Sequence, residues 1–79
     1  MKISEAIATR LNDICSQRDL TVNKLASLGC MTQSTLEYVI SGKSKNPKML
    51  TIVRICDGLG ISLKEFYDDE VFNNLDRED

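Results

Sequence analysis

The sequence contains no histidine and no tryptophan, and it has a single proline among its 79 residues. Without histidine it lacks the side chain that enzymes use most often for acid-base catalysis. A glycine-rich phosphate loop and a nucleophile-elbow pattern are missing as well. The carboxylates gather near the C-terminal end rather than around a predicted cleft, and so short a chain has little room to enclose a pocket. We therefore expect a protein that is not an enzyme and that uses no cofactor.

Long apolar runs are also missing, and none approaches the roughly 18–20 residues that a membrane span needs. The first five residues are amphipathic and include Glu5, unlike a signal or transit peptide. These features predict a cytoplasmic protein without membrane contact.

Cysteine is sparse. Cys15, Cys30 and Cys56 are odd in number, far apart in sequence and without a Cys-x-x-Cys pattern. Three lone thiols without histidine make a poor metal site, so we interpret them as small apolar side chains of a cytosolic protein and expect no metal.

The charge is unevenly distributed along the chain. The formal net charge is −2, but residues 1–60 carry eight basic and five acidic side chains, a balance of +3. Residues 61–79 carry two basic and seven acidic side chains, a balance of −5. For a phosphate-binding surface the local charge matters more than the sum, so the net charge does not exclude nucleic acid as a partner.

Five helical segments are predicted, with no strand pattern, and they indicate an all-α, compact five-helix bundle. The segments are 3–19, 21–29, 32–42, 46–60 and a short one that opens with the capping box at Ser62. Gly29, Gly42 and Gly60 are expected to end helices, and Asn46–Pro47 to begin one. The apolar residues predicted to face inward are Ile3, Ile7, Leu11, Ile14, Cys15, Leu25, Ala26, Leu28, Leu36, Val39, Ile40, Leu50, Ile52, Val53, Cys56, Leu63 and Phe66.

The segment from Thr21 to Pro47 carries the functional signal. Two short helices flank a turn at Gly29, Cys30 and Met31, which is the unit that places a helix in the major groove of DNA. The second helix begins Thr32-Gln33-Ser34-Thr35, and these short or amide side chains suit the reading of base edges. Helical spacing separates a polar face from the buried one; that polar face consists of Gln33, Ser34, Glu37, Tyr38 and Ser41.

An acid-free loop follows this helix. Residues 42–48 read Gly-Lys-Ser-Lys-Asn-Pro-Lys, with three lysines and several hydrogen-bonding side chains. Ammonium groups and main-chain amides of such a loop can lie along a phosphate backbone.

In this order and spacing the residues resemble the Cro and repressor-type (XRE-like) helix-turn-helix family over roughly residues 3–67. The matching stretches are Leu25-Ala26, Gly29, Thr32 to Leu36, Gly42 to Pro47 and Ile55 to Phe66. The resemblance implies a phage-repressor-like DNA-binding domain in residues 1–68, with the helix-turn-helix at about 21–41. Residues 69–79 are expected to form an acidic, partly frayed tail.

The resemblance also implies roles for individual residues. The residues that it implies read bases are Gln33, Ser34, Thr35 and Tyr38. Those that it implies contact the DNA backbone are Thr21, Asn23, Thr32, Lys43, Ser44, Lys45 and Asn46. Three departures from the family pattern stand out: Val22 replaces a frequent glutamine, Ile40 replaces a frequent glutamate, and the turn carries an extra residue near Cys30–Met31. The predicted partner is a double-stranded DNA operator, with no small-molecule effector.

Structural alternatives remain for each of these residues. Thr32 also fits a plain N-cap, Gln33 and Ser34 fit exposed helix positions, and Tyr38 fits packing on the domain surface. The lysines fit a solvated loop. The acidic tail fits a solvated, disordered segment, one that blocks nonspecific binding, or one that docks a partner.

Two functions remain open at this point. The first is a sequence-specific transcriptional regulator, expected to be a repressor and to bind as a homodimer through leftover apolar residues: Ile61, Tyr67, Val71, Phe72 and Leu75. The second is a protein-interaction module, antitoxin-like or adaptor, that keeps the fold without DNA binding.

Overall fold

The computed structural model describes residues 1–77, which form five α-helices, one 3-10 helix and no strand. The helices are α1 (Ile3–Gln17), α2 (Val22–Leu28), α3 (Gln33–Ile40), α4 (Met49–Leu59), α5 (Leu63–Tyr67) and η1 (Glu70–Phe72). The predicted all-α, five-helix bundle is confirmed. No helix in this part of the chain is long and apolar enough to cross a membrane.

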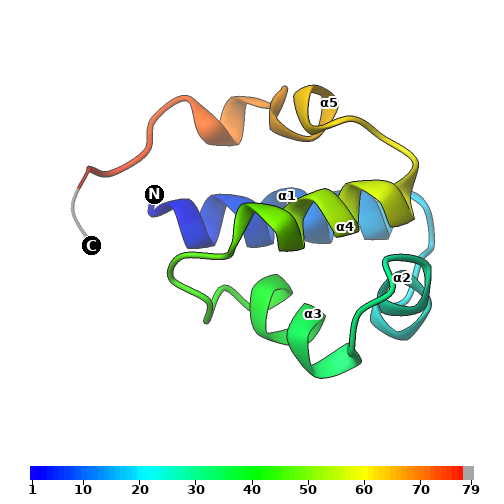
Figure 1. Ribbon diagram of the computed structural model, residues 1–79. Coiled ribbons are helices and arrows are strands. Elements are labelled where there is room, and N and C mark those ends of the chain that lie inside the picture. The colour runs from blue at the N-terminus through cyan, green and yellow to red at the C-terminus, as the bar shows by residue number, and fades with distance from the viewer. Residues whose placement is uncertain (78–79) are drawn as a thin grey trace.

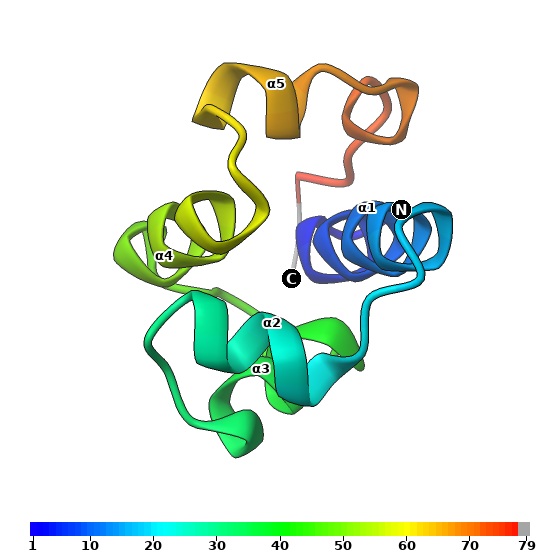
Figure 2. The same cartoon turned by 90° about the vertical axis from the view of Figure 1, so that its right-hand side faces the viewer.

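The helices are stacked in three levels (Figure 1). Helices α1 and α4 run through the middle, α2 and α3 lie on one side of them, and α5 with η1 lies on the other; the view turned by 90° agrees (Figure 2). Helix α2 packs on α4, α1 packs on α3, and η1 packs back on α1. The helix-turn-helix is thus held on a support made by the two longest helices.

One apolar core joins the three levels. Its largest fully buried side chains are Leu11, Leu25, Leu36, Ile52, Ile55 and Phe66, contributed by all five α-helices. Burying a side chain of this size stabilises the fold by about 1.5–3 kcal/mol. The core therefore fixes the position of α3 through Leu36 and that of α5 through Phe66.

Three predicted helix starts are confirmed by their caps. Thr21 accepts a hydrogen bond from the Lys24 backbone amide at 3.1 Å, and Thr32 accepts one from the Thr35 amide at 3.2 Å. Ser62 forms the predicted capping box with Glu65. Each cap satisfies a donor that the first turn of a helix leaves unpaired.

The start of α4 differs from the prediction. Lys48 is its N-cap, so Asn46 and Pro47 belong to the preceding loop. The buried face of α4 consists of Ile52, Ile55, Cys56 and Leu59. Leu50 lies on the opposite face and is 59% exposed. The prediction that Leu50 is buried was therefore wrong, and the spacing of Ile52, Ile55 and Leu59 decides which face packs.

Four smaller expectations also failed. Ile3, Leu28 and Leu63 lie at helix ends or edges and are exposed rather than buried. Helix α1 ends at Gln17 instead of near residue 19, because Asp19 adopts a left-handed conformation with a φ of 53°. The amides of Asp19 and Leu20 then donate to the carbonyls of Ser16 and Cys15, which closes the helix.

The turn between α2 and α3 closes in the same way. Gly29 caps α2 as predicted, but its φ is −88°, and the left-handed residue is Cys30, with a φ of 56°. The amides of Cys30 and Met31 donate to the carbonyls of Ser27 and Ala26. Cys30 thus occupies the position after the cap where glycine is usual.

Gly29 is required for a different reason. A Cβ atom at Gly29 would lie 2.9 Å from the carbonyl oxygen of Arg54, so α2 can approach α4 only with glycine here. Gly58, on α4, faces the same contact. A Cβ atom there would lie 3.0 Å from the backbone nitrogen of Gly29.

The acidic segment after α5 packs back on the body of the protein through η1 and makes a further contact at Asp76. Tyr67 and Phe72 stack edge-to-face with ring centroids 4.9 Å apart, and both contact the core beside Phe66. The backbone amide of Asp76 donates to the Met1 carbonyl at 2.9 Å. Residues 78 and 79 of the expected tail lie outside the described residues, and the domain boundary at residue 68 stays a prediction.

Candidate nucleic-acid interface

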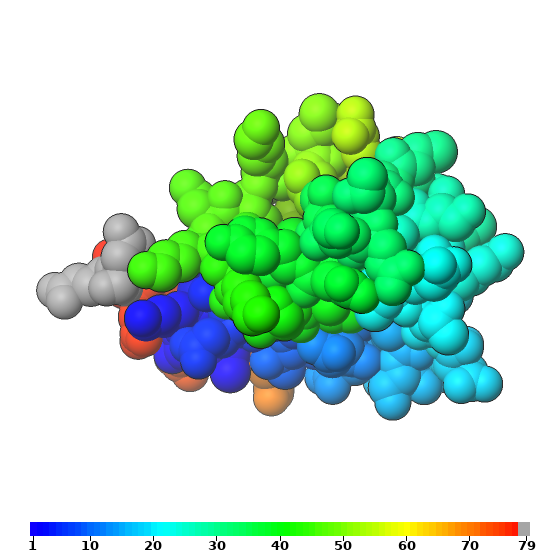
Figure 3. Space-filling model, turned by 90° about the horizontal axis from the view of Figure 1, so that it is seen from below, coloured from blue at the N-terminus to red at the C-terminus, as the bar shows by residue number. Residues whose placement is uncertain are grey.

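Helix α3 is held to the core by one face and exposes the other. Leu36 and Val39 are buried and Ile40 is half-buried, whereas the predicted polar face is exposed along the whole helix. Figure 3 looks onto this side of the molecule, with α3 in the centre, α2 beside it and the residues after α3 along another edge. The exposed set consists of Gln33, Ser34, Glu37, Tyr38 and Ser41.

The first turn of α3 is shaped by its cap. The Thr32 and Thr35 hydroxyls lie 2.8 Å apart, and one donates to the other. Thr32 therefore does act as an N-cap, and its hydroxyl also orients Thr35. Ser34 is exposed beside this pair, and Thr35 is exposed as well, so short polar side chains occupy the surface of the first turn.

Gln33 is held by hydrogen bonds from two directions. The Asn23 side-chain nitrogen Nδ2 donates to Gln33 Oε1 at 2.9 Å, and Gln33 Nε2 donates to Glu37 Oε1 at 2.9 Å. Asn23 lies in the first turn of α2, so the first contact joins the two helices of the motif. The amide of Gln33 consequently has a defined orientation before any ligand binds.

Val22 stands where a glutamine is frequent, and Asn23 places an amide side chain at the surface one residue later. Val22 is half-buried and packs against the core, so it is unavailable at the surface. Asn23, one residue later, is exposed and uses one N–H for Gln33. Its second N–H is available to a phosphate oxygen, as is the hydroxyl of the cap residue Thr21.

The loop after α3 is anchored at its start. Gly42 has a φ of 80°, which ends the helix, and the Ser44 amide donates to the Tyr38 carbonyl at 3.2 Å. Lys43, Lys45 and Asn46 are exposed. The backbone of the loop is therefore fixed next to α3 while the ammonium groups extend into solvent.

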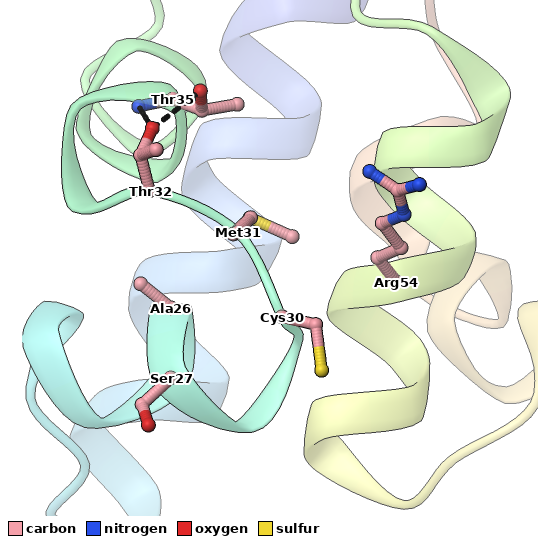
Figure 4. A pocket seen from close by; sticks show the side chains of 7 residues that line it. All are labelled: Ala26, Ser27, Cys30, Met31, Thr32, Thr35 and Arg54. Carbon is pink, nitrogen blue, oxygen red and sulfur yellow. Dashed lines mark hydrogen bonds between the residues drawn. The ribbon is translucent and has the colours of Figure 1, made fainter.

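Two open grooves run between α3 and α4 and meet at Thr35. The first has a volume of about 540 Å³ and is lined by α3, the loop and the start of α4, including Lys48 and Thr51. The second has a volume of about 550 Å³ and lies at the turn, with Arg54 on its α4 side (Figure 4). Lys48, Thr51 and Arg54 recur every three residues, so one polar edge of α4 borders both grooves.

Two arginines, Arg10 and Arg18, make contacts that join helices, and a third, Arg54, borders the groove at the turn. Arg10 donates to the Phe66 and Glu65 carbonyls at 2.9 and 3.0 Å and pairs with Asp69 at 3.4 Å, while Arg18 donates to the Leu59 carbonyl. These contacts join α1 to α5 and α4. Arg54 is exposed beside the first turn of α3. Among residues 1–77 the ion pairs are those of Arg10 and of the Met1 ammonium.

Sequence reasoning assigned no role to Glu37 or Arg54. The signal for Glu37 was its spacing of four from Gln33, which places the two side chains next to each other on a helix. The signal for Arg54 was its spacing of three and six from Thr51 and Lys48. The contact of Glu37 lies within α3, whereas the position of Arg54 beside α3 depends on how α4 packs, which only the fold shows.

The three cysteines do not form a cluster: Cys15 and Cys56 are buried in the core, and Cys30 is exposed at the turn. Within residues 1–77, no group of histidine, cysteine, aspartate or glutamate side chains could hold a metal ion. Burial raises the pKa of the Cys15 and Cys56 thiols, with Arg18 lowering the first slightly and Asp57 adding to the second. Both thiols therefore stay protonated and neutral in the core at neutral pH.

A pair of short helices joined by a tight turn, with a polar outer helix beside a lysine loop, defines a helix-turn-helix domain. Comparison with known proteins agrees: the Helix-turn-helix family model HTH_3 matches residues 13–66. The chain belongs to this XRE-type helix-turn-helix family of DNA-binding transcription regulators.

A solved structure is similar over nearly the whole chain. It is the crystal structure of the prophage Lp1 protein 11, with 36% sequence identity and a TM-score of 0.79. The match covers 95% of this chain and all of that one. No curated protein matches.

Proposed function

We propose that this protein is a transcriptional repressor that binds an operator in double-stranded DNA and reads it with α3 in the major groove. The observation that carries the proposal is the exposed polar face of α3, on which Gln33 is already oriented by Asn23 and Glu37. An α-helix fits the width of the major groove, and amide side chains there can distinguish base pairs. Bound across a promoter, the domain would exclude polymerase.

Four side chains of α3 are the proposed base readers. Gln33 can pair with adenine through one donor and one acceptor, and Ser34 and Thr35 can donate to or accept from either base type. Tyr38 is 56% exposed one turn later, so its ring or hydroxyl can reach a base or the backbone. All four are exposed on α3, the helix at the centre of the view in Figure 3.

Backbone contacts are proposed on both sides of α3. At the start of α2, Thr21 and Asn23 offer a hydroxyl and an N–H to one strand. Beyond α3, the loop offers Lys43, Ser44, Lys45 and Asn46. Thr32 lines the protein groove at the turn between α2 and α3. We add Arg54, because its guanidinium borders the same groove between α3 and α4 (Figure 4).

Two copies are proposed on one operator, because a single recognition helix covers only a few base pairs. Their half-sites would be about 34 Å, or one helical turn, apart. The apolar residues first considered for this contact pack largely on the protein's own core, Ile61, Tyr67 and Phe72 among them. Large apolar side chains are exposed elsewhere on the protein, Leu28, Met49 and Leu50 among them.

A protein-interaction module is the second candidate, favoured by the net charge of −2 and by these exposed apolar side chains. Selection of bound fragments from random-sequence DNA separates the two functions. A repressor should enrich one sequence and bind it at least about a thousandfold more tightly than random DNA, with a log-log salt slope of a few units. No enrichment and no binding at low salt would favour the interaction module.

Two substitutions test whether base reading and phosphate contact on the selected DNA site are made by different residues. Gln33→Ala should relax the preference at one base pair, whereas Lys45→Ala should weaken binding to all sequences alike and reduce the salt slope by about one. Fluorescence anisotropy across a salt series measures both effects. Lys64→Ala is the matched control, because Lys64 lies on α5, on the opposite side of the molecule (Figure 1). Equal losses for Lys45→Ala and Lys64→Ala would contradict the proposed interface.

A further inference from the structure

Glu37 is an acidic side chain on a surface that we propose binds DNA. It lies one helical turn from Gln33 and is exposed in the same groove as Ser34, Tyr38 and Lys43. A carboxylate facing phosphates lowers affinity for every DNA sequence. A role other than affinity would explain its presence there, and the hydrogen bond that it accepts from Gln33 points to such a role.

The bond to Glu37 fixes which way the Gln33 amide points. A carboxylate is only an acceptor, so the Gln33 atom facing Glu37 must be the nitrogen Nε2. Oε1 then faces Asn23, whose Nδ2 donates to it. This assignment follows from the chemistry of Glu37, since the two ends of an amide differ only in what they can donate or accept.

The network also limits what Gln33 can offer to a base. An amide nitrogen has two N–H donors and an amide oxygen has two lone pairs. Glu37 takes one donor and Asn23 takes one lone pair, which leaves a single donor and a single acceptor. Adenine presents the complementary pair in the major groove, an acceptor at N7 and a donor at N6.

Guanine is disfavoured by the same count. It presents two acceptors, N7 and O6, and an unrestrained glutamine could meet them with both N–H groups of its amide nitrogen. With one N–H held by Glu37, only one donor remains for N7. The acceptor Oε1 would then face O6, which is also an acceptor, and the two cannot form a hydrogen bond. Leaving such groups unpaired is costly once the groove excludes water.

We infer that Glu37 is a specificity-determining residue, which restricts Gln33 to adenine by holding one of its amide protons. It is a positioning residue that acts through Gln33. The inference rests on the proposed function, because it concerns the base that Gln33 reads. It assigns Glu37 to discrimination between bases and not to affinity.

The test compares Glu37→Ala with Glu37→Gln. Both remove the same negative charge, so both should bind random DNA more tightly than the wild type. Glutamine at this position keeps an oxygen that can accept from Gln33 Nε2, whereas alanine does not. The pair therefore separates the charge from the acceptor, and exposed helical positions tolerate both residues.

The readout is the ratio of affinities for adenine and guanine at the base pair that Gln33→Ala identifies in selection. We expect the wild type to favour adenine by about tenfold or more. Glu37→Ala should reduce the ratio to less than about threefold, and Glu37→Gln should restore most of it. In the free protein, the Gln33 side-chain amide proton resonances should shift in Glu37→Ala and shift less in Glu37→Gln.

Each other outcome is informative. If Glu37→Ala keeps the wild-type ratio, or if both variants lose it equally, the inference is overturned while DNA reading by α3 stands. If Glu37→Ala alters a different base pair, Glu37 reads a base itself and the inference is again wrong. If the wild type enriches no sequence at all, the proposed function fails and the inference fails with it.

Discussion

Cys30 is the residue at which the chain leaves α2 for α3, and its left-handed backbone conformation is unusual for a residue with a side chain. The φ of 56° brings Cβ close to the following carbonyl, which costs about 1–2 kcal/mol relative to glycine. The side chain is exposed, so burial does not offset this cost. The two backbone hydrogen bonds that close the turn hold the residue in place.

Cys30→Gly should therefore stabilise the protein. Relief of the left-handed strain outweighs the greater freedom of glycine in the unfolded chain, which costs about 0.4–1 kcal/mol. We expect the free energy of unfolding in urea to rise by about 0.5–1 kcal/mol. Ser27→Gly, three residues earlier within α2, is the control and should lower the stability, because its backbone is helical. A loss of stability in both variants would show that residue 30 is not left-handed.

At single residues, sequence reasoning succeeded where the side chain itself makes the local contact. Thr21, Thr32 and Ser62 cap helices within three residues of their own position, so the sequence contains the whole interaction. It failed at Cys30, because cysteine has no preference for left-handed backbone and the nearby Gly29 was the natural candidate.

Among the elements, the contact between α2 and α4 depends on two glycines. Gly29 and Gly58 face each other, and a Cβ atom on Gly58 would also lie 3.2 Å from the Leu25 side chain. This close approach seats α2 on α4 and so fixes the angle from which α3 leaves the turn. A helical glycine that is costly in propensity is retained here because of packing.

Gly58→Ala tests this contact. Alanine favours a helix over glycine by about 1 kcal/mol, so an unconstrained position would gain stability. At Gly58 the added methyl group meets backbone atoms that cannot move independently, and overpacking of this kind costs about 1–3 kcal/mol. We expect a net loss of stability in thermal unfolding. Asp57→Ala, the exposed neighbour on α4, should change it by less than about 0.5 kcal/mol. A more stable Gly58→Ala protein would contradict the close packing.

The existence of the helices could be predicted from the apolar spacing, but the way in which they pack against one another could not. The start of α4 and the exposure of Leu50 depend on which face meets α2, a contact between segments some thirty residues apart. The candidate site shows the same limit. The polar face of α3 was predicted, whereas the link from Asn23 and the position of Arg54 arise from neighbouring helices.

In the whole molecule, the modest net charge hides two separated regions. The lysine loop, residues 42–48, lies next to α3, whereas the acidic residues from α5 to η1 lie on the far side of α1 and α4 (Figure 1). A charge distribution of this kind orients a protein as it approaches a polyanion. The acidic side would face away from DNA bound at α3.

The buried thiols and Tyr67 make the stability sensitive to alkaline pH. Burial raises the pKa of Cys15, Cys56 and Tyr67 above their ordinary values, so the folded protein holds these protons more tightly than the unfolded chain. Their contribution to stability is complete below the ordinary pKa, about 8.5 for cysteine and 10 for tyrosine. It is lost as the pH rises through the raised values of the folded state.

We therefore expect the melting temperature to stay level from pH 7 to about 8.5 with respect to these groups and to fall above that range. Circular dichroism at 222 nm during heating measures it. Cys56→Ala should lower the melting temperature at pH 7 but flatten the alkaline decline, because one buried proton is removed. An equally steep decline in this variant would exclude Cys56 as a cause.

The two tyrosines lie in contrasting surroundings. Tyr38 is exposed on the outer face of α3, and Tyr67 is half-buried against Phe66 and Phe72 at the opposite level of the fold. Because the chain has no tryptophan, these two phenols supply all of its long-wavelength protein fluorescence. The molecule thus carries one optical probe at the proposed DNA surface and another in the packing of its acidic end. Replacing Tyr67 by phenylalanine would leave a single emitter that reports only on what approaches α3.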